Sequence, residues 1–523
     1  MSSKDVQMKV IDKMFTKWFV QGRTNNRKPD YIANIARNVR IRNGGMTVRD
    51  WWEELYEWTG DWVQGIIGNN GELLFVHDNT LKRFDLTDNT VDDIQAIDSV
   101  DGKVSFIPYG IYTIILTGVD YPWVYDWSTC TQLTATEIAS GTNPSFGVKY
   151  AWFTVVNSTD WAKNVIKISR PIGIASQTNS YNWDLTNWSE SITYDWEVIG
   201  LESSMNFLWV FTKNTIEKMT KDNLTTVGWV QSLFTLPIAK WQEVLNNDCI
   251  VSAGDIVLFI TANLQVATIE YKQTNPTEPV FTIISDRMQD LTDIQDWLDN
   301  LHEDQSKAFG IFDNKRNLVK RYFRSFTSTV NDVCLVYDIT NQTFYVDDNK
   351  YFSCETVLDT KYYAGWVFSW DIYQDEVGKN DWDDGIDWEY SVDMIAGTKF
   401  RKKVLWSWLS GVINYPAKIK WEVEVDNILE FSDYITGTNY NDSDSDLGIW
   451  WAMTWERPVG WEISEPYEDN NPFTVRITDS RLRANGETIR MRWSGNEKDQ
   501  DFVLDYLDVS YKPLRTVETS SKF

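Results

Sequence analysis

The acidic stretch "DWDDGIDWEY", residues 381–390, combines residue types that could bind a metal or transfer protons. It could form a calcium loop, a catalytic acid cluster, or a turn between two strands. An EF-hand loop needs oxygen ligands at positions 1, 3 and 5, Gly at 6 and Glu at 12. Counted from Asp381, position 5 is Gly385 and position 12 is Val392, so the spacing does not fit. The dipeptide Asp384-Gly385 instead predicts a hairpin turn without metal.

Other catalytic motifs find little support in the sequence. The chain has two histidines, His77 and His302, and the segment "HEDQS" lacks the second histidine of a zinc-protease motif. A Ser-His-Asp triad would have to use one of these two histidines. The four cysteines are far apart and form no CxxC pair. We therefore expect no enzyme activity, no cofactor and no bound metal.

The many carboxylates and tryptophans leave one alternative open. Asp and Glu together number 76, and 28 residues are Trp. Aromatic faces beside carboxylates are typical of sugar-binding grooves, and two carboxylates at a defined separation hydrolyse glycosides. A carbohydrate-binding or glycan-depolymerising β-propeller protein at a cell or virion surface therefore stays the alternative function.

The overall charge argues against a protein that coats nucleic acid. The formal net charge is −27, whereas phosphate neutralisation needs clustered Lys and Arg. The first residues, "MSSKDVQMKVIDKMF", lack the apolar segment of a signal peptide. The apolar run "YGIYTIILTGV", residues 109–119, is too short to span a bilayer. These features predict a soluble protein without a membrane-spanning segment, made in a reducing compartment.

Strand patterns dominate the chain. The recurring unit is an apolar run, a polar turn and a second run, as in "ELLFVHDNTLKRFDL" (72–86) and "VCLVYDITNQTFYV" (333–346). Successive units start roughly 35–55 residues apart, a period typical of propeller blades. Helix patterns are few, and the best are residues 30–39 and 290–305. The predicted fold is all-β, with a β-propeller-like platform of repeated hairpins.

Three regions are predicted. Residues 1–50 form an N-terminal arm, residues 51–400 the propeller-like domain, and residues 401–523 a C-terminal β-sandwich-like domain. The last domain is indicated by the alternating strand "AKIKWEVEVDNILEFSD" (417–433). A Trp-rich insertion at about 440–472 interrupts it, and loops of this length are often functional. Its tryptophans either pack on their own sheet or bind a partner: Trp450, Trp451, Trp455 and Trp461.

Several segments resemble one known family. "VFSWDIYQDEVGKNDWDDGIDWEYSVD" (367–393), residues 397–427 and residues 491–514 resemble segments of phage tail hub and nozzle proteins. "NVRIRNGGMTVRDW" (38–51) is similar to the opening arm of that family, and residues 180–194 and 198–220 match in style. The family comprises tail nozzle, muzzle and packaged-DNA stabilisation proteins of short-tailed bacteriophages, including crAss-like phages. The Trp content and the insertion depart from its pattern.

The resemblance implies a structural virion protein of the phage tail, made in the host cytoplasm. Copies would form a homo-oligomeric ring, six-fold in symmetry, around the DNA exit channel. The ring would bind other tail or portal-proximal virion proteins, retain packaged DNA, and conduct it during DNA ejection without tight binding. A ring needs two different contact surfaces on each subunit. The basic block in residues 22–50 is one candidate, either as a partner surface or as an ordinary solvated strand; it includes Arg37, Arg40 and Arg42.

Overall fold

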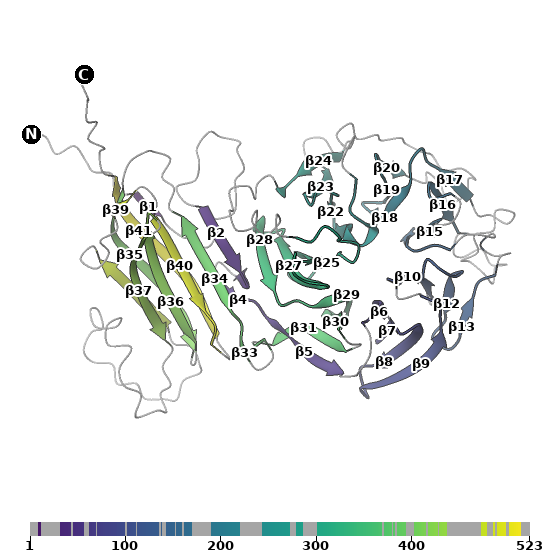
Figure 1. Cartoon of the computed structure of the whole chain (residues 1–523), viewed down its shortest axis with the longest axis horizontal. Helices are drawn as coiled ribbons and strands as arrows, with labels where there is room; N and C mark the ends of the chain where they lie inside the picture. The colour runs from purple at the N-terminus through teal and green to yellow at the C-terminus, as the bar shows by residue number, and fades with distance from the viewer. Residues whose placement is uncertain are drawn as a thin grey trace, which may run out of the picture.

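The computed structural model gives the chain two β domains side by side, a disc and a two-layered domain (Figure 1). The structure describes residues 9–11, 32–42, 45–56, 62–69, 71–99, 102–110, 112–134, 138, 143–151, 153–158, 162–169, 190–219, 243–271, 279–285, 301–368, 371–378, 380–381, 384–393, 402–414, 417–426, 428–436, 472–478, 485–486, 489–497 and 501–513. Among these residues Asn247–Cys249 form a 3₁₀ turn, and no described helix is long and apolar enough to cross a membrane.

The disc is a seven-bladed β-propeller. Its first four sheets are β6 (Gly65–Asn69), β7 (Glu72–His77), β8 (Thr80–Asp85) and β9 (Thr90–Ala96); β10 (Ser105–Tyr109), β11 (Tyr112–Leu116), β12 (Trp123–Tyr125) and β13 (Cys130–Gln132); β14 (Gly147–Tyr150), β15 (Phe153–Asn157), β16 (Val165–Ile168) and β17 (Glu190–Thr193); and β18 (Val198–Ser204), β19 (Phe207–Thr212) and β20 (Ile216–Met219).

The last three blades complete the disc. They are β21 (Val251–Ala253), β22 (Ile256–Ile260), β23 (Val266–Tyr271) and β24 (Pro279–Ile283); β25 (Phe309–Asp313), β26 (Leu318–Arg324), β27 (Asn331–Asp338) and β28 (Thr343–Asp348); and β29 (Phe352–Leu358), β30 (Lys361–Trp366), β31 (Ile372–Gly378) and β5 (Trp51–Tyr56). The first strands of successive blades contact one another in a closed circle, from β6 through β29 and back to β6. This circle confirms the predicted propeller-like fold.

The turns of the propeller explain why its hairpins form. Asp78 and Asn79 take up positive φ angles of 47° and 53° between β7 and β8. Asp and Asn tolerate this region better than most residues, and such two-residue turns match the twist of paired strands. The strands themselves carry apolar residues that are fully buried between blades, such as Leu73 and Phe75 on β7.

The propeller is closed by a strand from the N-terminal side of the chain. β5 pairs antiparallel with β31 and supplies the outer strand of the seventh blade. Both ends of the propeller segment therefore meet in one sheet, and opening the disc would break the β5–β31 hydrogen bonds. The predicted propeller domain, residues 51–400, already contained this strand.

The second domain is a sandwich of two sheets (Figure 1). One sheet has seven strands: β1 (Lys9–Ile11), β3 (Val39–Arg42), β4 (Gly45–Val48), β35 (Lys402–Asn414), β38 (Pro472–Thr478), β39 (Asn485–Gly486) and β41 (Asp501–Pro513). The other continues from the sixth blade into β2 (Ile32–Arg37), β34 (Trp388–Asp393), β40 (Ile489–Gly495), β36 (Lys418–Val425) and β37 (Ile428–Thr436), making one nine-stranded sheet.

The sandwich core is aromatic, as the Trp content suggested. Trp388, Trp421 and Trp493 are at most 1% exposed, and the Trp388 ring lies 4.6 Å from the Phe502 ring of the opposite sheet. On β36 the buried side chains alternate with partly exposed ones over much of the strand, as the sequence pattern predicted. Burying large aromatic surfaces is the main source of stability for such a two-layered domain.

The structure corrects two of the expected boundaries. The predicted N-terminal arm is no separate region, because β1, β2, β3 and β4 pair within the sandwich. The sandwich also begins before residue 401, since β34 lies in its second sheet. Residues 30–39, expected to form a helix, contain the strand β2, since backbone pairing with β34 on one side and β28 on the other outweighs their local helical pattern.

Candidate functional site

The most concentrated polar site among the described residues lies where the propeller meets the sandwich. We call it the joint, and it consists of Arg37, Asn38, Arg40, Arg49, Asp347 and Asp348. The two aspartates end β28 of the sixth blade. The other four residues belong to the N-terminal segment that forms β2, β3 and β4 or directly follow it.

Asn38 fixes the turn between β2 and β3. Its φ angle of 55° lies in the left-handed region, which Asn tolerates. The backbone N–H donates to the Val346 carbonyl at 2.8 Å, and Nδ2 donates to the Asp387 carbonyl at 2.6 Å and to the Asp348 carboxylate. One side chain thus holds the end of a propeller blade, the N-terminal segment and the residue before β34 together.

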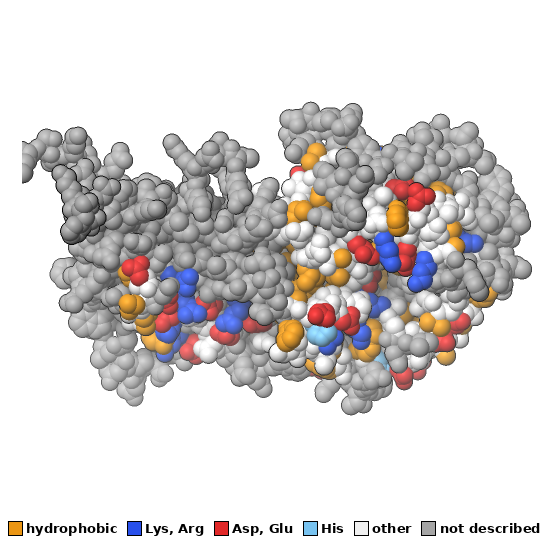
Figure 2. Space-filling model, turned by 45° about the horizontal axis from the view of Figure 1, so that its top comes forward, with side chains coloured by type: hydrophobic (Ala, Val, Ile, Leu, Met, Phe, Trp, Pro, Cys, Tyr) orange, Lys and Arg blue, Asp and Glu red, His pale blue; other side chains and the backbone are white. Residues whose placement is uncertain are grey.

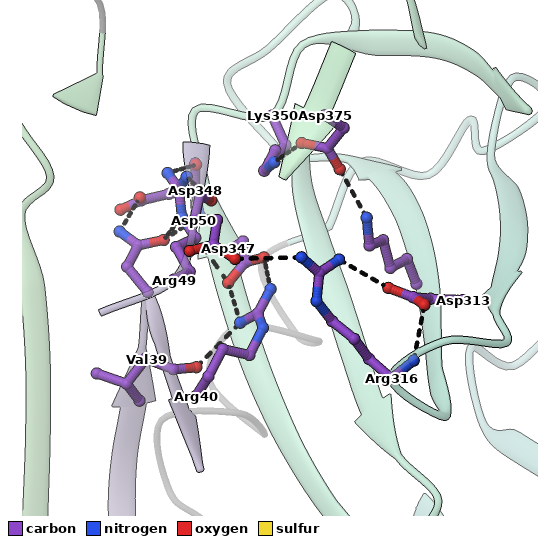
Figure 3. Close-up of polar contacts among 12 residues, drawn as sticks. Val39, Arg40, Arg49, Asp50, Asp313, Arg316, Asp347, Asp348, Lys350 and Asp375 are labelled. Atoms are coloured by element: carbon purple, nitrogen blue, oxygen red, sulfur yellow. Dashed lines mark hydrogen bonds and ion pairs between the residues drawn. The ribbon is translucent and has the colours of Figure 1, made fainter. Parts of the chain in front are cut away.

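Arg40 forms the central ion pair of the joint (Figure 3). Its Nη1 donates to Asp347 Oδ1 at 2.8 Å and its Nη2 to Asp347 Oδ2 at 2.5 Å. The Arg40 and Asp347 side chains are 2% and 1% exposed, so water screens neither charge. A two-pronged guanidinium–carboxylate contact of this kind fixes both distance and orientation.

Arg49 adds a second buried guanidinium. Nε donates to Asn38 Oδ1 at 2.8 Å and lies 3.9 Å from Asp347 Oδ1, while Nη2 donates to the Asp348 carbonyl at 3.1 Å. From the neighbouring residue Asp50, the network reaches Arg316 of the sixth blade at 3.3 Å (Figure 3). The N-terminal segment is therefore tied to the propeller by several charged contacts rather than one.

Arg37 lies at the outer side of the joint. Its side chain is 36% exposed, and Nη2 donates to Asp387 Oδ2 at 2.8 Å. Nη1 lies 3.6 Å from Asp348 Oδ2, and Nη2 lies 3.8 Å from Glu389 Oε2. Exposed pairs of this kind stabilise a fold weakly, so Arg37 contributes less than Arg40.

The basic block thus has a different place from the one expected. Arg40 binds Asp347 of its own chain and is buried, so its guanidinium is not available to a neighbouring subunit. Arg37 also pairs within the chain but remains partly exposed. Arg42 lies in β3, and its side chain is outside the described residues, as are four tryptophans of the insertion: Trp450, Trp451, Trp455 and Trp461.

A second charged cluster lies between the sixth and seventh blades. Lys320 of β26 donates to Asp375 Oδ2 at 2.6 Å and to Glu355 Oε1 at 3.2 Å. Lys350 donates to Asp375 Oδ1, and the Tyr322 hydroxyl donates to Glu355 Oε2 at 2.6 Å. We call these five residues the blade cluster. The two lysines are 1% exposed and the two carboxylates 0%.

Glu355 is a titratable group of this cluster with a strongly shifted pKa. Burial raises the pKa of Glu355 to about 7, although the nearby Lys320 opposes the shift. A perturbed pKa often marks a catalytic acid or base. Here the carboxyl group is 0% exposed and its two oxygens already accept from Lys320 and Tyr322. The group therefore acts within the fold, by linking two blades.

Sequence analysis missed the blade cluster. Its members lie in four different strands or connections and meet only when two blades pack. One signal was present in the sequence: Lys320 lies within the largely apolar run "LVKRYFR", and a lysine on a buried strand needs a buried partner. The structure buries every residue of this strand, β26, except the last. The sequence alone does not identify which carboxylate pairs with Lys320.

The acidic stretch "DWDDGIDWEY", residues 381–390, begins with a small hairpin. Asn380 pairs with Gly385 and Asp381 with Asp384, in strands β32 (Asn380–Asp381) and β33 (Asp384–Gly385). The predicted turn is therefore present, but Asp384-Gly385 lies in its second strand, and residues 382–383 connect the two strands. Among the described residues, no group of three or more His, Cys, Asp or Glu side chains is placed to hold a metal ion.

We expect calcium to leave the stability of the protein unchanged. A ligand that binds only the native state raises the melting temperature by mass action. Differential scanning fluorimetry of the full chain with millimolar calcium, and with EDTA, should give the same melting temperature. A rise of several degrees with calcium, lost on changing Asp381 and Asp384 to Asn, would show that the hairpin is a metal loop.

Comparison with known proteins identifies no family. No protein-family model matches the chain, and no curated protein matches it. A solved structure described as "YCF48 bound to D1 peptide" is similar over 62% of this chain and 95% of that chain. The identity is 10% and the TM-score 0.40, values too low to support an argument about function.

Proposed function

We propose that this chain is a non-enzymatic structural subunit of a bacteriophage tail, a nozzle, muzzle or hub protein. Copies of it close into a six-fold ring around the DNA exit channel, contact other tail proteins, and help retain and then conduct packaged DNA. The resemblance of residues 38–51, 367–393, 397–427 and 491–514 to that protein family motivates the proposal.

The observation that carries the proposal is the construction of the joint. The N-terminal segment places β2 inside the sheet that runs from the sixth blade into the sandwich, and β5 inside the seventh blade. Buried ion pairs fix it in between. Two domains connected only by a linker would move relative to each other by default. A stiff two-domain body instead suits a part that must keep its place in a ring while DNA passes.

The charge distribution supports a conduit rather than a DNA clamp. The chain carries a net charge of −27, and Figure 2 shows acidic and basic side chains interspersed over the described part of one face. Three arginines of the N-terminal block pair with carboxylates of the same chain: Arg37, Arg40 and Arg49. A wall that neutralised phosphates would release counterions and hold the DNA.

Two binding assays test this proposal. Full-length protein at low salt should bind duplex DNA weakly or not at all, and a glycan array should give no specific signal. Micromolar DNA binding that weakens steeply with salt would reject the conduit and indicate a clamp. Strong, specific glycan binding by the isolated chain would instead favour the carbohydrate-binding alternative.

A further inference from the structure

In the blade cluster a lysine amine touches a carboxyl group at a buried site. Lys320 Nζ lies 2.6 Å from Asp375 Oδ2, and both side chains are at most 1% exposed. Cγ of Asp375 is one covalent bond away from Oδ2, so the amine lies near the roughly 3–3.5 Å separation at which two atoms react. An amine nitrogen and a carboxyl carbon are the two atoms that an amide bond joins.

The other oxygen of Asp375 meets a second lysine. Lys350 donates to Asp375 Oδ1, and its side chain is 1% exposed (Figure 3). A carboxylate resists attack by an amine because it already carries negative charge. Attack on Cγ places further negative charge on Oδ1, and a cation fixed beside this oxygen stabilises that charge without rearrangement. Lys350 thus makes Asp375 a better electrophile.

Glu355 is placed to move protons between Lys320 and Asp375. Its Oε1 lies 3.2 Å from Lys320 Nζ, and the Tyr322 hydroxyl holds its Oε2 at 2.6 Å. Burial raises the pKa of Glu355 to about 7, so this carboxyl group can both take up and release a proton near neutral pH. Transfer of a proton from Lys320 to Glu355 removes two buried charges at once and leaves the neutral amine that attacks.

Aromatic rings surround the two lysines. Lys320 Nζ lies 4.9 Å from the centroid of the Tyr362 ring. Lys350 Nζ lies 5.3 Å from the centroid of the Phe352 ring. In water, the high concentration of water opposes the condensation of an amine with an acid. Burial of the site and the effective concentration of well-oriented partners, which reaches about 10⁵–10⁸ M, favour the condensation here.

From this geometry we propose that Lys320 and Asp375 join in a self-catalysed isopeptide bond. Glu355 takes a proton from the Lys320 ammonium, and the freed Nζ attacks Asp375 Cγ while Lys350 stabilises the charge on Oδ1. Glu355 carries two protons in turn from Nζ to Oδ2, the Cγ–Oδ2 bond breaks, and one water molecule leaves. One ammonium and one carboxylate thus become one amide and one water, and no oxidant, reductant or further reactant is needed.

The bond ties the sixth blade to the seventh. Lys320 lies in β26 and Asp375 in β31, the strand that pairs with β5, and 55 positions separate the two residues in sequence. A covalent link of this kind constrains the unfolded chain as a disulfide does, and it needs no oxidising compartment. The charged blade cluster is the state from which the bond forms. The inference does not depend on the phage-tail proposal, because the geometry of the cluster alone carries it.

Mass spectrometry of the intact, denatured full-length protein tests the inference. The parent chain should be lighter than its sequence mass by one water molecule, and peptide mapping should show a branched peptide that joins Lys320 to Asp375. Trypsin should not cleave after Lys320 in these chains. Lys320→Arg keeps a cation but removes the primary amine, and Glu355→Gln removes the proton carrier. Both variants should have their full sequence mass.

Two controls make the result specific. Lys350→Arg keeps a cation beside Asp375 Oδ1 and should still lose one water molecule. Lys82 and Asp93 are in contact at 2.5 Å, but the Asp93 side chain is 70% exposed, so this pair should stay unlinked in the same peptide map. A melting curve shows whether Glu355→Gln is folded, and the branched peptide of the parent decides the matter independently of any variant.

Three results would overturn the inference. The first is a parent chain that keeps its full sequence mass after days in the folded state. The second is a water loss that persists in Lys320→Arg, because it would come from another site, such as a succinimide at Asp384-Gly385. The third is a branched peptide that forms equally well in Glu355→Gln. Intact mass also separates linked from unlinked chains, so any unfolding measurement can be assigned to one of them.

Discussion

Replacing Arg40 by Met should lower the free energy of unfolding by about 3–5 kcal/mol, the usual cost of removing one partner of a buried ion pair. The reason is that Asp347, 1% exposed, would keep a buried charge while losing two hydrogen bonds. Denaturant unfolding followed by circular dichroism measures the loss. Because the joint connects two domains, we also expect the sandwich and the propeller to unfold in separate steps in this variant.

Matched variants make this expectation specific. Arg83→Met removes an arginine that is 30% exposed and paired with Asp92 at 2.6 Å, and should cost less than about 1 kcal/mol. Combining Arg40→Met with Asp347→Asn should cost less than the sum of the single changes, since the double variant leaves neither member of the Arg40–Asp347 pair as a buried charge without the other, and Arg49 keeps its hydrogen bonds to Asn38 Oδ1 and the Asp348 carbonyl. A loss at Arg40 no larger than that at Arg83 would show that the joint does not hold the domains together.

Replacing Glu355 by Gln should change how stability depends on pH. The pKa of Glu355 is raised to about 7 from an ordinary value of 4.5, so the folded state keeps its proton while the unfolded chain ionises. The stability that this group contributes is therefore fully present below pH 4.5 and is lost as the pH rises to about 7. The Gln side chain does not titrate, so the stability of the variant relative to the parent should rise by roughly 3 kcal/mol across this window.

Unfolding free energies at several pH values between 4 and 8 measure this difference. Only the difference between variant and parent is informative, because other carboxyl groups titrate in the opposite sense: backbone hydrogen bonds lower the pKa of Asp126 to about 2. Glu303→Gln, the same substitution at an exposed position, serves as the control for the chemical change itself. A constant difference for Glu355→Gln would mean that its carboxyl group does not titrate in this window.

The repeated hairpins of the propeller could be predicted because their signals are local. Most turns have their own Asn, Asp or Gly, and most strands their own apolar run, so the period is visible without any long-range information. The strand β36 could be predicted equally well, from its alternating apolar and polar residues. The strand β2 could not be predicted, because its pairing partners β28 and β34 are more than 300 residues away in sequence. Pairing with them outweighs the local helical pattern of β2.

For the candidate site, too, local features could be predicted from the sequence, whereas contacts between distant residues could not. The sequence showed a basic block around Arg37, Arg40 and Arg42, but 76 acidic residues offered possible partners. Which of them would be buried beside Arg40 depends on how the sandwich meets the sixth blade, and Asp347 is separated from it by 307 residues. Residue types thus predicted that the arginines need partners, whereas only the fold identifies the partner as part of the same chain.

Native mass spectrometry of the full-length protein over a range of micromolar concentrations tests whether the chain assembles into a ring. The chain has a mass of 61.0 kDa, so every species can be assigned a copy number. We expect a closed ring of one defined copy number, six, that grows at the expense of the monomer as concentration rises. Ring closure requires two different contact surfaces on each subunit and gives a single sharp mass. A monomer that persists at every concentration, with no larger species, would contradict ring assembly.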